Sequence, residues 1–325
     1  MTENTNLESS SEKKIFLKKE ATGLFGHSPE ERTTEELLKY SIANVDKPKG
    51  PTSHQVSDYV QNIFGLAKAG HSGTLDPGVT GVQPTALGRA TRIAQFLLTA
   101  PKEYVCLMHI HKDLGPGGEE RIRQSFQKFM GKIQQMPPQR SAIKRQLRTR
   151  EIYDLKILEI KGQDVLFSIK CQAGTYIRKI CTDFGRVLGV SAHMFELRRT
   201  QAGPFTEKDN LVTLSDLEDA HKYYLEEKND KFLRYCLQPI EKALKYLPKC
   251  WVLDTTIKSL THGRDLGIPG ISKMEEFSTG DDVALLTLKG ELIAMGQALM
   301  STKDIMSKDK GLALKVKKVF MESVE

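Results

Sequence analysis

The sequence lacks several features that would assign it to other classes of protein. No apolar run approaches the roughly 20 residues that a membrane-spanning helix needs, and the polar start has no apolar centre of a secretory signal. The five cysteines are scattered, odd in number and without a C-x-x-C pair, so they indicate neither a disulfide framework nor a cysteine zinc site. We therefore expect a cytoplasmic protein whose cysteines are reduced.

Acidic residues are too few to balance the basic ones. The sequence has 48 Lys and Arg against 41 Asp and Glu, which gives a formal net charge of +7. Basic side chains that neutralise phosphates release condensed counterions, so this excess fits a polyanionic partner such as RNA. Many basic proteins bind no nucleic acid, and charge alone does not identify the partner.

Four segments have sequence patterns that are typical of helices. Residues 52–55 match a capping box, and helical apolar spacing follows them. Apolar residues also repeat at helical spacing over residues 87–97 and 176–188, and Gly189 is placed to end the second of these helices. Residues 215–218 match another capping box, so we expect a further helix to begin there.

Alternating apolar residues predict strands between these helices. Residues 104–110 alternate in this way, and residues 157–160 and 165–171 flank a glycine-containing connector of hairpin length. Strands that pair with a neighbour in sequence are antiparallel, and the helices do not alternate regularly with them. The pattern therefore predicts an α+β fold with a mixed, mainly antiparallel sheet.

A change of texture after residue 247 predicts a second domain. The length of 325 residues exceeds what one hydrophobic core usually serves. Beyond residue 247 the elements are short and the turns many, and residues 283–288 and 292–295 flank a Lys-Gly turn as in a compact hairpin. We expect a polar extension over residues 1–22, a larger domain over residues 23–247 and a small β-barrel over residues 248–325.

A glycine-rich loop at residues 70–81 carries a single acid. It has four glycines in twelve positions, a density that suits backbone passing close to a ligand. Pro77 disfavours the helical conformation for Asp76, so the Asp76 carboxylate is held on an extended or turning backbone and can point into a cleft. An Asp before Pro is also an ordinary turn residue. The loop by itself therefore leaves both readings open.

Several motifs in the same order resemble the TruB family of pseudouridine synthases. The barrel sequence, with T-H-G at residues 261–263, is similar to the archaeal, dyskerin-related branch of that family. The resemblance runs from about Gly23 to Met321. The four motifs are K-P-x-G-x-T-S at 47–53, G-H-S-G-T-L-D-P at 70–77, G-T-Y-I-R at 174–178 and L-R-R-T at 197–200.

The resemblance implies an enzyme that converts uridine in RNA to pseudouridine, with Asp76 as its catalytic carboxylate. The uracil must leave its glycosidic nitrogen and reattach through carbon, which involves no net oxidation, so no redox cofactor and no metal are expected. A stacked uridine must also be flipped out of the RNA before it can react.

Three further residues take roles by the same resemblance. Tyr104 corresponds to a tyrosine that stacks on the flipped base, His71 to a residue that props the vacated stack, and Arg178 to an arginine that pairs with the catalytic aspartate. Each has a plainer reading: Tyr104 starts an alternating strand and can be core, His71 can be a satisfied loop histidine, and Arg178 can be a solvated helix residue.

Basic residues without intervening acids predict an RNA-backbone contact. A solvated loop or a charged strand edge is the alternative. The C-terminal barrel resembles a PUA domain, an RNA-binding module, and Arg264 lies in its glycine-rich first loop. The clustered basic residues are Arg140, Lys144, Arg145, Arg148 and Arg150.

The family resemblance also implies substrates and partners. These are the T-arm uridine of tRNA, rRNA sites selected by an H/ACA guide RNA, and three small accessory proteins: a zinc-ribbon type, a Gar type and a kink-turn binder. A non-catalytic RNA-binding scaffold of a ribonucleoprotein remains the alternative function. An RNA methyltransferase would need a nucleotide-cofactor loop, and Gly115 to Gly118 lacks the G-x-G-x-x-G spacing.

Overall fold

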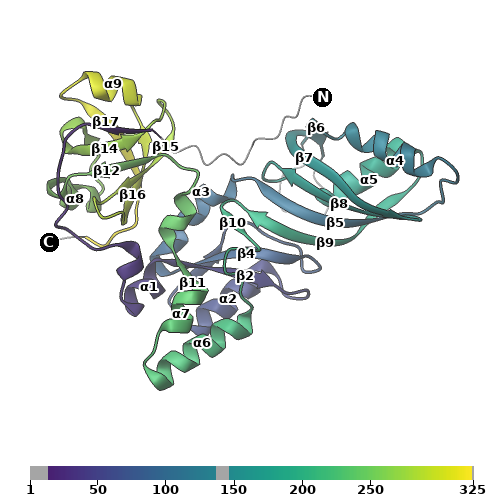
Figure 1. Cartoon of the computed structure of the whole chain (residues 1–325), viewed down its shortest axis with the longest axis horizontal. Coiled ribbons are helices and arrows are strands. Elements are labelled where there is room, and N and C mark those ends of the chain that lie inside the picture. The colour runs from purple at the N-terminus through teal and green to yellow at the C-terminus, as the bar shows by residue number, and fades with distance from the viewer. Residues whose placement is uncertain (1–13, 137–145, 324–325) are drawn as a thin grey trace. The chain divides into compact units, whose positions relative to one another are not determined.

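The computed structural model describes residues 14–136 and 146–323, and the structural statements below refer to these residues. Contacts within the chain separate two compact units. One comprises residues 36–238, and the other combines residues 14–35 with residues 239–323. Each unit has its own sheet (Figure 1). Each also has its own hydrophobic core.

The structure groups the segments before residue 36 and after residue 238 into one unit, which is not the domain division that the sequence predicts. The sequence pattern placed residues 23–35 and 239–247 with the larger domain, whereas their contacts place them in the C-terminal unit. A buried ion pair links these segments to each other, because the Arg32 guanidinium donates to both carboxylate oxygens of Glu241 at 2.6 and 2.8 Å. Glu241 Oε1 also accepts from the Leu292 amide of the same unit at 2.8 Å.

A mixed ten-stranded sheet forms the centre of the larger unit. Its strands are β2 (Ser41–Lys47), β3 (Ala69–His71), β4 (Thr80–Leu87), β5 (Lys102–Ile110), β6 (Gly131–Gln135), β7 (Arg148–Lys161), β8 (Asp164–Cys171), β9 (Ala192–Ala202), β10 (Phe205–Thr206) and β11 (Leu237–Pro239). The main path runs β11-β2-β4-β9-β5-β8-β7-β6, with β3 added to β4 and β10 to β9. Most of these pairs are antiparallel, whereas β4 and β9 run parallel. The predicted α+β fold with a mixed sheet is confirmed.

Helices pack on this sheet in two groups (Figure 1). Phe126 of α4 and Phe184 of α5 contact each other edge to face at 4.5 Å and share a core with Phe167 of β8. Val60 of α2 and Leu217 of α6 belong to a second core beside β2. The helices are α1 (Thr34–Tyr40), α2 (Ser53–Ile63), η2 (Gly88–Ile93), α3 (Ala94–Leu98), α4 (Gly118–Gln127), α5 (Ile177–Leu188), α6 (Leu214–Glu227) and α7 (Lys231–Cys236).

Local sequence patterns located several elements correctly. Helix α2 begins after Thr52, whose side chain accepts from the Gln55 amide at 3.2 Å while Gln55 Oε1 accepts from the Thr52 amide at 2.8 Å. Helix α5 ends at Gly189, which has φ +73°. Strand β5 and the antiparallel β7–β8 hairpin, with Gly162 at φ +59° in its turn, also lie where the sequence predicts them.

Two helix predictions were wrong in detail. Helix α6 is capped by Thr213, whose side chain accepts from the Asp216 amide at 3.1 Å, so it begins before the predicted capping box at 215–218. The segment 87–97 is not one helix, because Leu87 ends β4 and Gly88, with φ +53° and close to the backbone of α1, begins η2, which α3 follows.

A seven-stranded sheet forms the C-terminal unit, in the order β1-β14-β12-β15-β16-β17-β13. The predicted hairpin is confirmed as β15 and β16. Strand β1 of the N-terminal segment pairs antiparallel with β14, with Ile15 opposite Glu275. The elements are β1 (Ile15–Leu17), η1 (Pro29–Glu31), η3 (Ile240–Leu244), β12 (Lys249–Val252), α8 (Asp254–Thr261), β13 (Leu266–Gly267), η4 (Ile268–Gly270), β14 (Ile271–Glu275), β15 (Asp282–Leu286), β16 (Leu292–Ala298), α9 (Thr302–Ser307) and β17 (Leu312–Val319).

No helix in the described ranges is both long enough and apolar enough to cross a bilayer. The described cysteines are all free and buried.

Candidate active site

Asp76 lies in the loop between β3 and β4. The Val79 amide donates to the Asp76 carbonyl at 2.9 Å, which closes a tight turn. Leu75 is buried, with 4% of its surface exposed, whereas the Asp76 side chain is 58% exposed. The loop therefore anchors itself in the core with one residue and presents the next one to solvent.

The N-terminal end of helix α2 holds the near side of this loop. The Leu75 amide donates to Ser53 Oγ at 2.8 Å, and Ser53 is the first residue of α2. Gln83 Nε2 of β4 donates to the Ser53 carbonyl at 3.0 Å. Gln83 is fully buried, so it gives α2 a polar anchor beneath the loop.

Lys47 holds the far side of the loop. Its buried ammonium donates to the carbonyls of Pro48, Pro77 and Val79 at 2.9, 3.3 and 2.9 Å. The Gly50 amide also donates to the Pro77 carbonyl, at 2.9 Å. Burial lowers the pKa of Lys47, the charge of Arg199 lowers it further, and the charge of Asp76 opposes them. The motif at 47–53 thus serves as the scaffold of the loop that carries Asp76.

Arg178 reaches the Asp76 carboxylate from another part of the chain. It occupies the first turn of α5 and forms an ion pair with Asp76 through Nη2. Tyr176, two residues before Arg178, is held by the side chain of Gln135. Gln135 Oε1 accepts from the Tyr176 amide at 3.0 Å, and Gln135 Nε2 donates to the Tyr176 carbonyl at 3.2 Å. A guanidinium at this position orients a carboxylate through charge-assisted hydrogen bonding.

Tyr104 lies on β5, opposite Arg199 of β9 in the sheet register. Its ring is partly buried and packs against the core, and its hydroxyl lies close enough to the Arg199 guanidinium for each group to shift the pKa of the other. Burial raises the pKa of Tyr104, and the charge of Asp76 adds to this, whereas Arg199 acts in the opposite direction. The phenol is therefore protonated at neutral pH, and its oxygen feels the charges of both Asp76 and Arg199.

His71 closes β3 just before the Asp76 loop. Its ring contacts that of His54 edge to face at 4.8 Å, and its Nδ1 accepts from the Gly73 amide at 3.3 Å. Burial, with smaller contributions from His54 and Arg199, lowers the pKa of His71 to about 4. His71 is therefore a neutral imidazole near pH 7.

The predicted basic cluster is only partly described. Arg140, Lys144 and Arg145 lie outside the described residues, whereas Arg148 and Arg150 lie on β7, paired with Gln135 and Ile133 of β6. Arg150 approaches the G-T-Y-I-R motif, since its Nη2 lies 3.2 Å from where a Cβ would sit on Gly174. Arg264 lies in the C-terminal unit after α8, where its amide donates to Ser259 at 3.0 Å.

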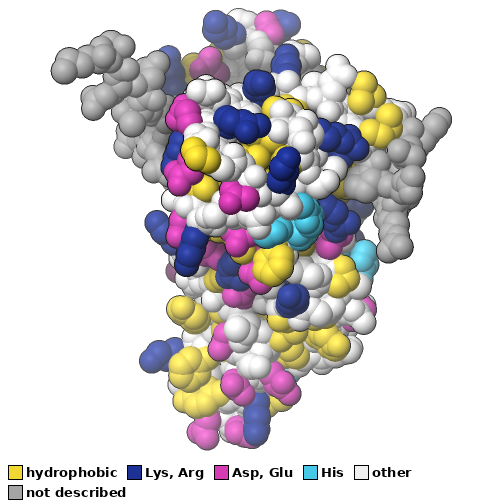
Figure 2. All heavy atoms as spheres, turned by 90° about the vertical axis from the view of Figure 1, so that its right-hand side faces the viewer, with side chains coloured by type: hydrophobic (Ala, Val, Ile, Leu, Met, Phe, Trp, Pro, Cys, Tyr) yellow, Lys and Arg dark blue, Asp and Glu magenta, His cyan; other side chains and the backbone are white. Residues whose placement is uncertain are grey.

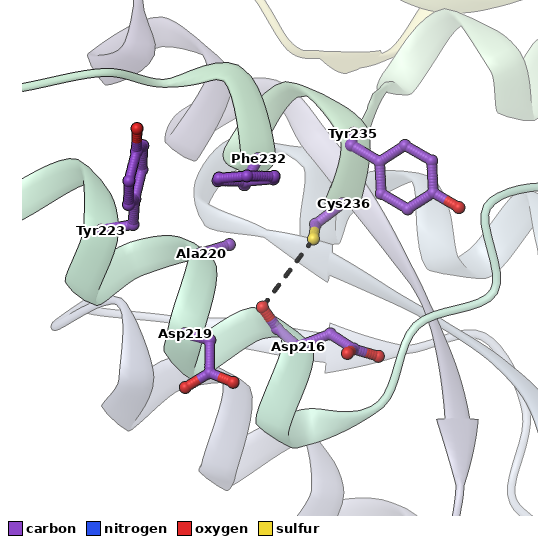
Figure 3. Close-up of a pocket in the computed structure, with 7 residues that line it drawn as sticks. All are labelled: Asp216, Asp219, Ala220, Tyr223, Phe232, Tyr235 and Cys236. Carbon is purple, nitrogen blue, oxygen red and sulfur yellow. Dashed lines mark hydrogen bonds between the residues drawn. The ribbon is translucent and has the colours of Figure 1, made fainter.

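The larger unit also has a histidine cluster and a pocket that involve none of these residues. His109, His111 and His193 form a histidine cluster in which His111 and His193 are exposed, and His193 Nδ1 lies 2.8 Å from His111 Nε2. Histidine side chains gather on the face drawn in Figure 2. Within the described ranges, no group of three or more His, Cys, Asp or Glu side chains is arranged to hold a metal ion. A pocket of about 380 Å³ opens between α6 and α7 (Figure 3), lined by Asp216, Asp219, Ala220, Tyr223, Phe232, Tyr235 and Cys236.

Comparison with known proteins identifies the chain. Residues 61–177 match the model of the TruB family pseudouridylate synthase N-terminal domain, and residues 178–245 match the tRNA pseudouridylate synthase B C-terminal domain. A relative from Methanothermobacter thermautotrophicus, "Probable tRNA pseudouridine synthase B", is 51% identical over 299 residues, which cover 92% of this chain and 91% of the relative. The chain belongs to the TruB family of pseudouridylate synthases.

Other similarities extend over the rest of this TruB-family chain. Residues 248–320 match a PUA domain and residues 4–57 match the DKCLD domain. A relative of the same name from Thermococcus gammatolerans is 49% identical, with 94% of this chain and 90% of the relative covered. The resemblance to a pseudouridine synthase with a C-terminal PUA domain is thus confirmed.

Solved structures agree along nearly the whole TruB-family chain. A chain in the crystal structure of a Cbf5–Nop10–Gar1 complex is 46% identical with a TM-score of 0.90, covering 97% of this chain and 96% of that one. A chain in the structure of an H/ACA ribonucleoprotein bound to a substrate RNA containing 2′-deoxyuridine is 44% identical with a TM-score of 0.89 and the same coverages.

The structure of this TruB-family enzyme brings some predicted residues together and adds two others. Asp76 and Arg178 form an ion pair. The charge of Asp76 also contributes to the raised pKa of Tyr104. Lys47 and Arg199 belong to motifs that the sequence displays, but their contacts with the Asp76 loop follow only from the fold. The positive charges of Lys47 and Arg199 within these motifs were the available signal.

Proposed function

We propose that this pseudouridine synthase isomerises uridine to pseudouridine in RNA through the carboxylate of Asp76. The observation that carries the proposal is the exposed Asp76 carboxylate, paired with Arg178 on a loop anchored on both sides. A flipped uridine needs an accessible carboxylate that is held still, and both conditions are met by this loop.

The neighbouring side chains take complementary roles in the proposal. Arg178 fixes the direction of the Asp76 carboxylate oxygens through a charge-assisted contact. Tyr104 offers a ring on which the uracil stacks and a hydroxyl near the base. His71, neutral at physiological pH, props the gap that the flipped base leaves in the RNA. The isomerisation exchanges a carbon–nitrogen for a carbon–carbon bond without net oxidation, so we expect it to proceed without a redox cofactor or metal.

We further propose two classes of RNA substrate. The names of the relatives support tRNA, for which the family resemblance suggests the T-arm uridine. The titles of the similar structures support rRNA uridines selected by an H/ACA guide RNA, with accessory proteins of the Nop10 and Gar1 types. A kink-turn-binding protein as third partner, and a cytoplasmic location, stay predictions from sequence.

RNA binding is assigned to two surfaces in this proposal. Arg148 and Arg150 on β7, continuing into the segment with Arg140, Lys144 and Arg145, would contact the RNA backbone near the catalytic unit. The PUA domain, with Arg264 beside α8, would place the RNA relative to Asp76. Phosphate contacts of this kind position a substrate without reading its sequence.

A direct test incubates the purified chain with an unmodified tRNA transcript, and separately with guide RNA, accessory proteins and an rRNA fragment. Pseudouridine is then located by chemical mapping. We expect product at a defined uridine in each assay. Tight RNA binding without product under both conditions would instead favour the non-catalytic scaffold.

A further inference from the structure

Arg199 is a buried arginine whose charge meets no carboxylate among the described residues. It is the largest of the fully buried side chains, with 1% of its surface exposed. Its neighbour Arg198 differs, because it forms ion pairs with Asp46 and Glu207 at 2.9 and 2.5 Å. A buried charge without an opposite charge is costly to the fold, so the bonds that Arg199 does make are informative.

Those bonds join the parts of the protein that carry the proposed catalytic groups. Arg199 Nε donates to the Val82 carbonyl of β4 at 2.7 Å, and Nη2 donates to the Gly73 carbonyl of the Asp76 loop at 3.2 Å. The Arg199 side chain also lies opposite Tyr104 of β5 in the strand register, so the two side chains are neighbours on one face of the sheet. One guanidinium therefore ties the Asp76 loop to β4 beside Tyr104.

The chemistry of arginine decides how Arg199 acts on the Tyr104 hydroxyl. A guanidinium has only donors, so toward Arg199 the Tyr104 oxygen serves only as an acceptor, and its own hydrogen stays available to another partner. The positive charge also stabilises negative charge on the same oxygen. Burial and the charge of Asp76 raise the pKa of Tyr104, and Arg199 is the group that opposes them.

The isomerisation requires a proton transfer for which such an oxygen is suited. Uridine carries hydrogen at C5 and its glycosidic bond at N1, whereas pseudouridine carries hydrogen at N1 and its glycosidic bond at C5. Once the C1′–C5 bond has formed, the C5–H bond breaks and its electron pair restores the C5–C6 double bond. A base must take the C5 proton, and N1 must gain one from water.

We propose that Arg199 is a positioning residue for this proton transfer, acting through the hydroxyl of Tyr104. The Tyr104 oxygen takes the C5 proton while its own hydrogen passes to water, so the phenol is neutral before and after the step. Arg199 holds the Tyr104 oxygen beside the uracil and stabilises the negative charge that builds on this oxygen during the transfer. The inference rests on the proposed function, since it places the uracil between Asp76 and Tyr104.

The experiment compares Arg199→Met and Arg199→Lys with wild type, using RNA whose target uridine carries hydrogen or deuterium at C5. Single-turnover rates and RNA affinities are measured for each enzyme. Both variants should lose about tenfold or more in rate, in line with the weakening of a general base, while RNA affinity stays close to wild type. The hydrogen-to-deuterium rate ratio should rise, because breaking the C5–H bond becomes more limiting.

Two controls separate positioning from general damage. Arg198→Met removes the adjacent arginine and its ion pairs, so it should lower the melting temperature and leave the isotope ratio as in wild type. In a Tyr104→Phe background, Arg199→Met should change the isotope ratio no further, because the oxygen through which it acts is absent.

A wild-type isotope ratio in the Arg199 variants would overturn the inference, even if their rates fell. Should Arg199→Met fail to fold, Arg199→Lys decides the question, since it keeps the charge but loses the guanidinium. Asp76→Asn separates the two proposals. Product formation by Asp76→Asn contradicts the proposed function, whereas an inactive Asp76→Asn together with wild-type isotope ratios at position 199 contradicts the Arg199 role alone.

Discussion

Arg178 and Asp76 form an ion pair across 102 positions of the chain, and both side chains are more than half exposed, at 52% and 58%. Exposed pairs of this kind contribute only about 0–1 kcal/mol to folding. The protein nevertheless anchors both ends of the pair, through Ser53 and Lys47 on one side and Gln135 on the other. Such support for a pair with little value for stability is typical of a functional site.

Replacing Arg178 should therefore affect activity far more than stability. Arg178→Met should shift the free energy of unfolding by no more than about 1 kcal/mol. It should slow pseudouridine formation roughly ten- to hundredfold, the equivalent of one charge-assisted hydrogen bond. Arg186→Met is the matched control, because Arg186 lies on the same helix, is 71% exposed and pairs with Asp183 at 3.2 Å. A large loss of stability in Arg178→Met, with activity retained, would contradict this account.

The close packing of β4 against β9 makes a second prediction. Gly81 has φ +104°, and a Cβ at this position would lie 2.2 Å from the Arg199 carbonyl oxygen. Gly81→Ala should cost about 3 kcal/mol or more, because the strands must separate and the backbone is strained. Gly78→Ala in the same loop is the control, since nothing lies within 4 Å of its Cβ position. Urea unfolding should show the difference, and equal costs would exclude this explanation.

Burial of His71 makes stability depend on pH. Its pKa is about 4 in the folded protein and near 6.5 when unfolded, so the unfolded chain binds more protons between these values. The contribution is present above pH 6.5 and is lost as pH falls toward 4, by up to about 3 kcal/mol. Urea unfolding of wild type at pH 7 and pH 4.5 should show this loss, and His71→Gln should lose less. The same pH dependence in His71→Gln would rule out His71 as its source.

The basic residues of β7 can be tested through salt. If Arg148 and Arg150 neutralise two phosphates, replacing both by Met should flatten the slope of log affinity against log salt by roughly 1.4 to 1.8. Arg234→Met on α7 serves as the control, because Arg234 pairs locally with Asp230 at 2.7 Å. An unchanged slope in the double variant would leave these arginines as a charged strand region without an RNA contact.

The limits of prediction from sequence have physical causes. Helix α5 and the β7–β8 hairpin were predicted because periodicity and turn residues act over a few positions. The start of α6 was missed because two capping patterns overlap, and the one at Thr213 forms.

For the site, the motifs identified Asp76 and Arg178 as candidates. They could not assign Lys47 and Arg199, because those side chains act on carbonyls 30 and 126 positions away. Carbonyls are present at every residue, so such contacts leave no mark in the sequence pattern. Only the folded backbone shows which of them a buried cation can reach.

The most direct measurement compares wild type with Asp76→Asn, which keeps the shape of the side chain and removes its charge. RNA affinity and the formation of pseudouridine in an unmodified tRNA transcript are measured on the same preparations. The account predicts RNA binding within about threefold of wild type and no detectable pseudouridine in the variant. Pseudouridine formed by Asp76→Asn at the wild-type rate would contradict it.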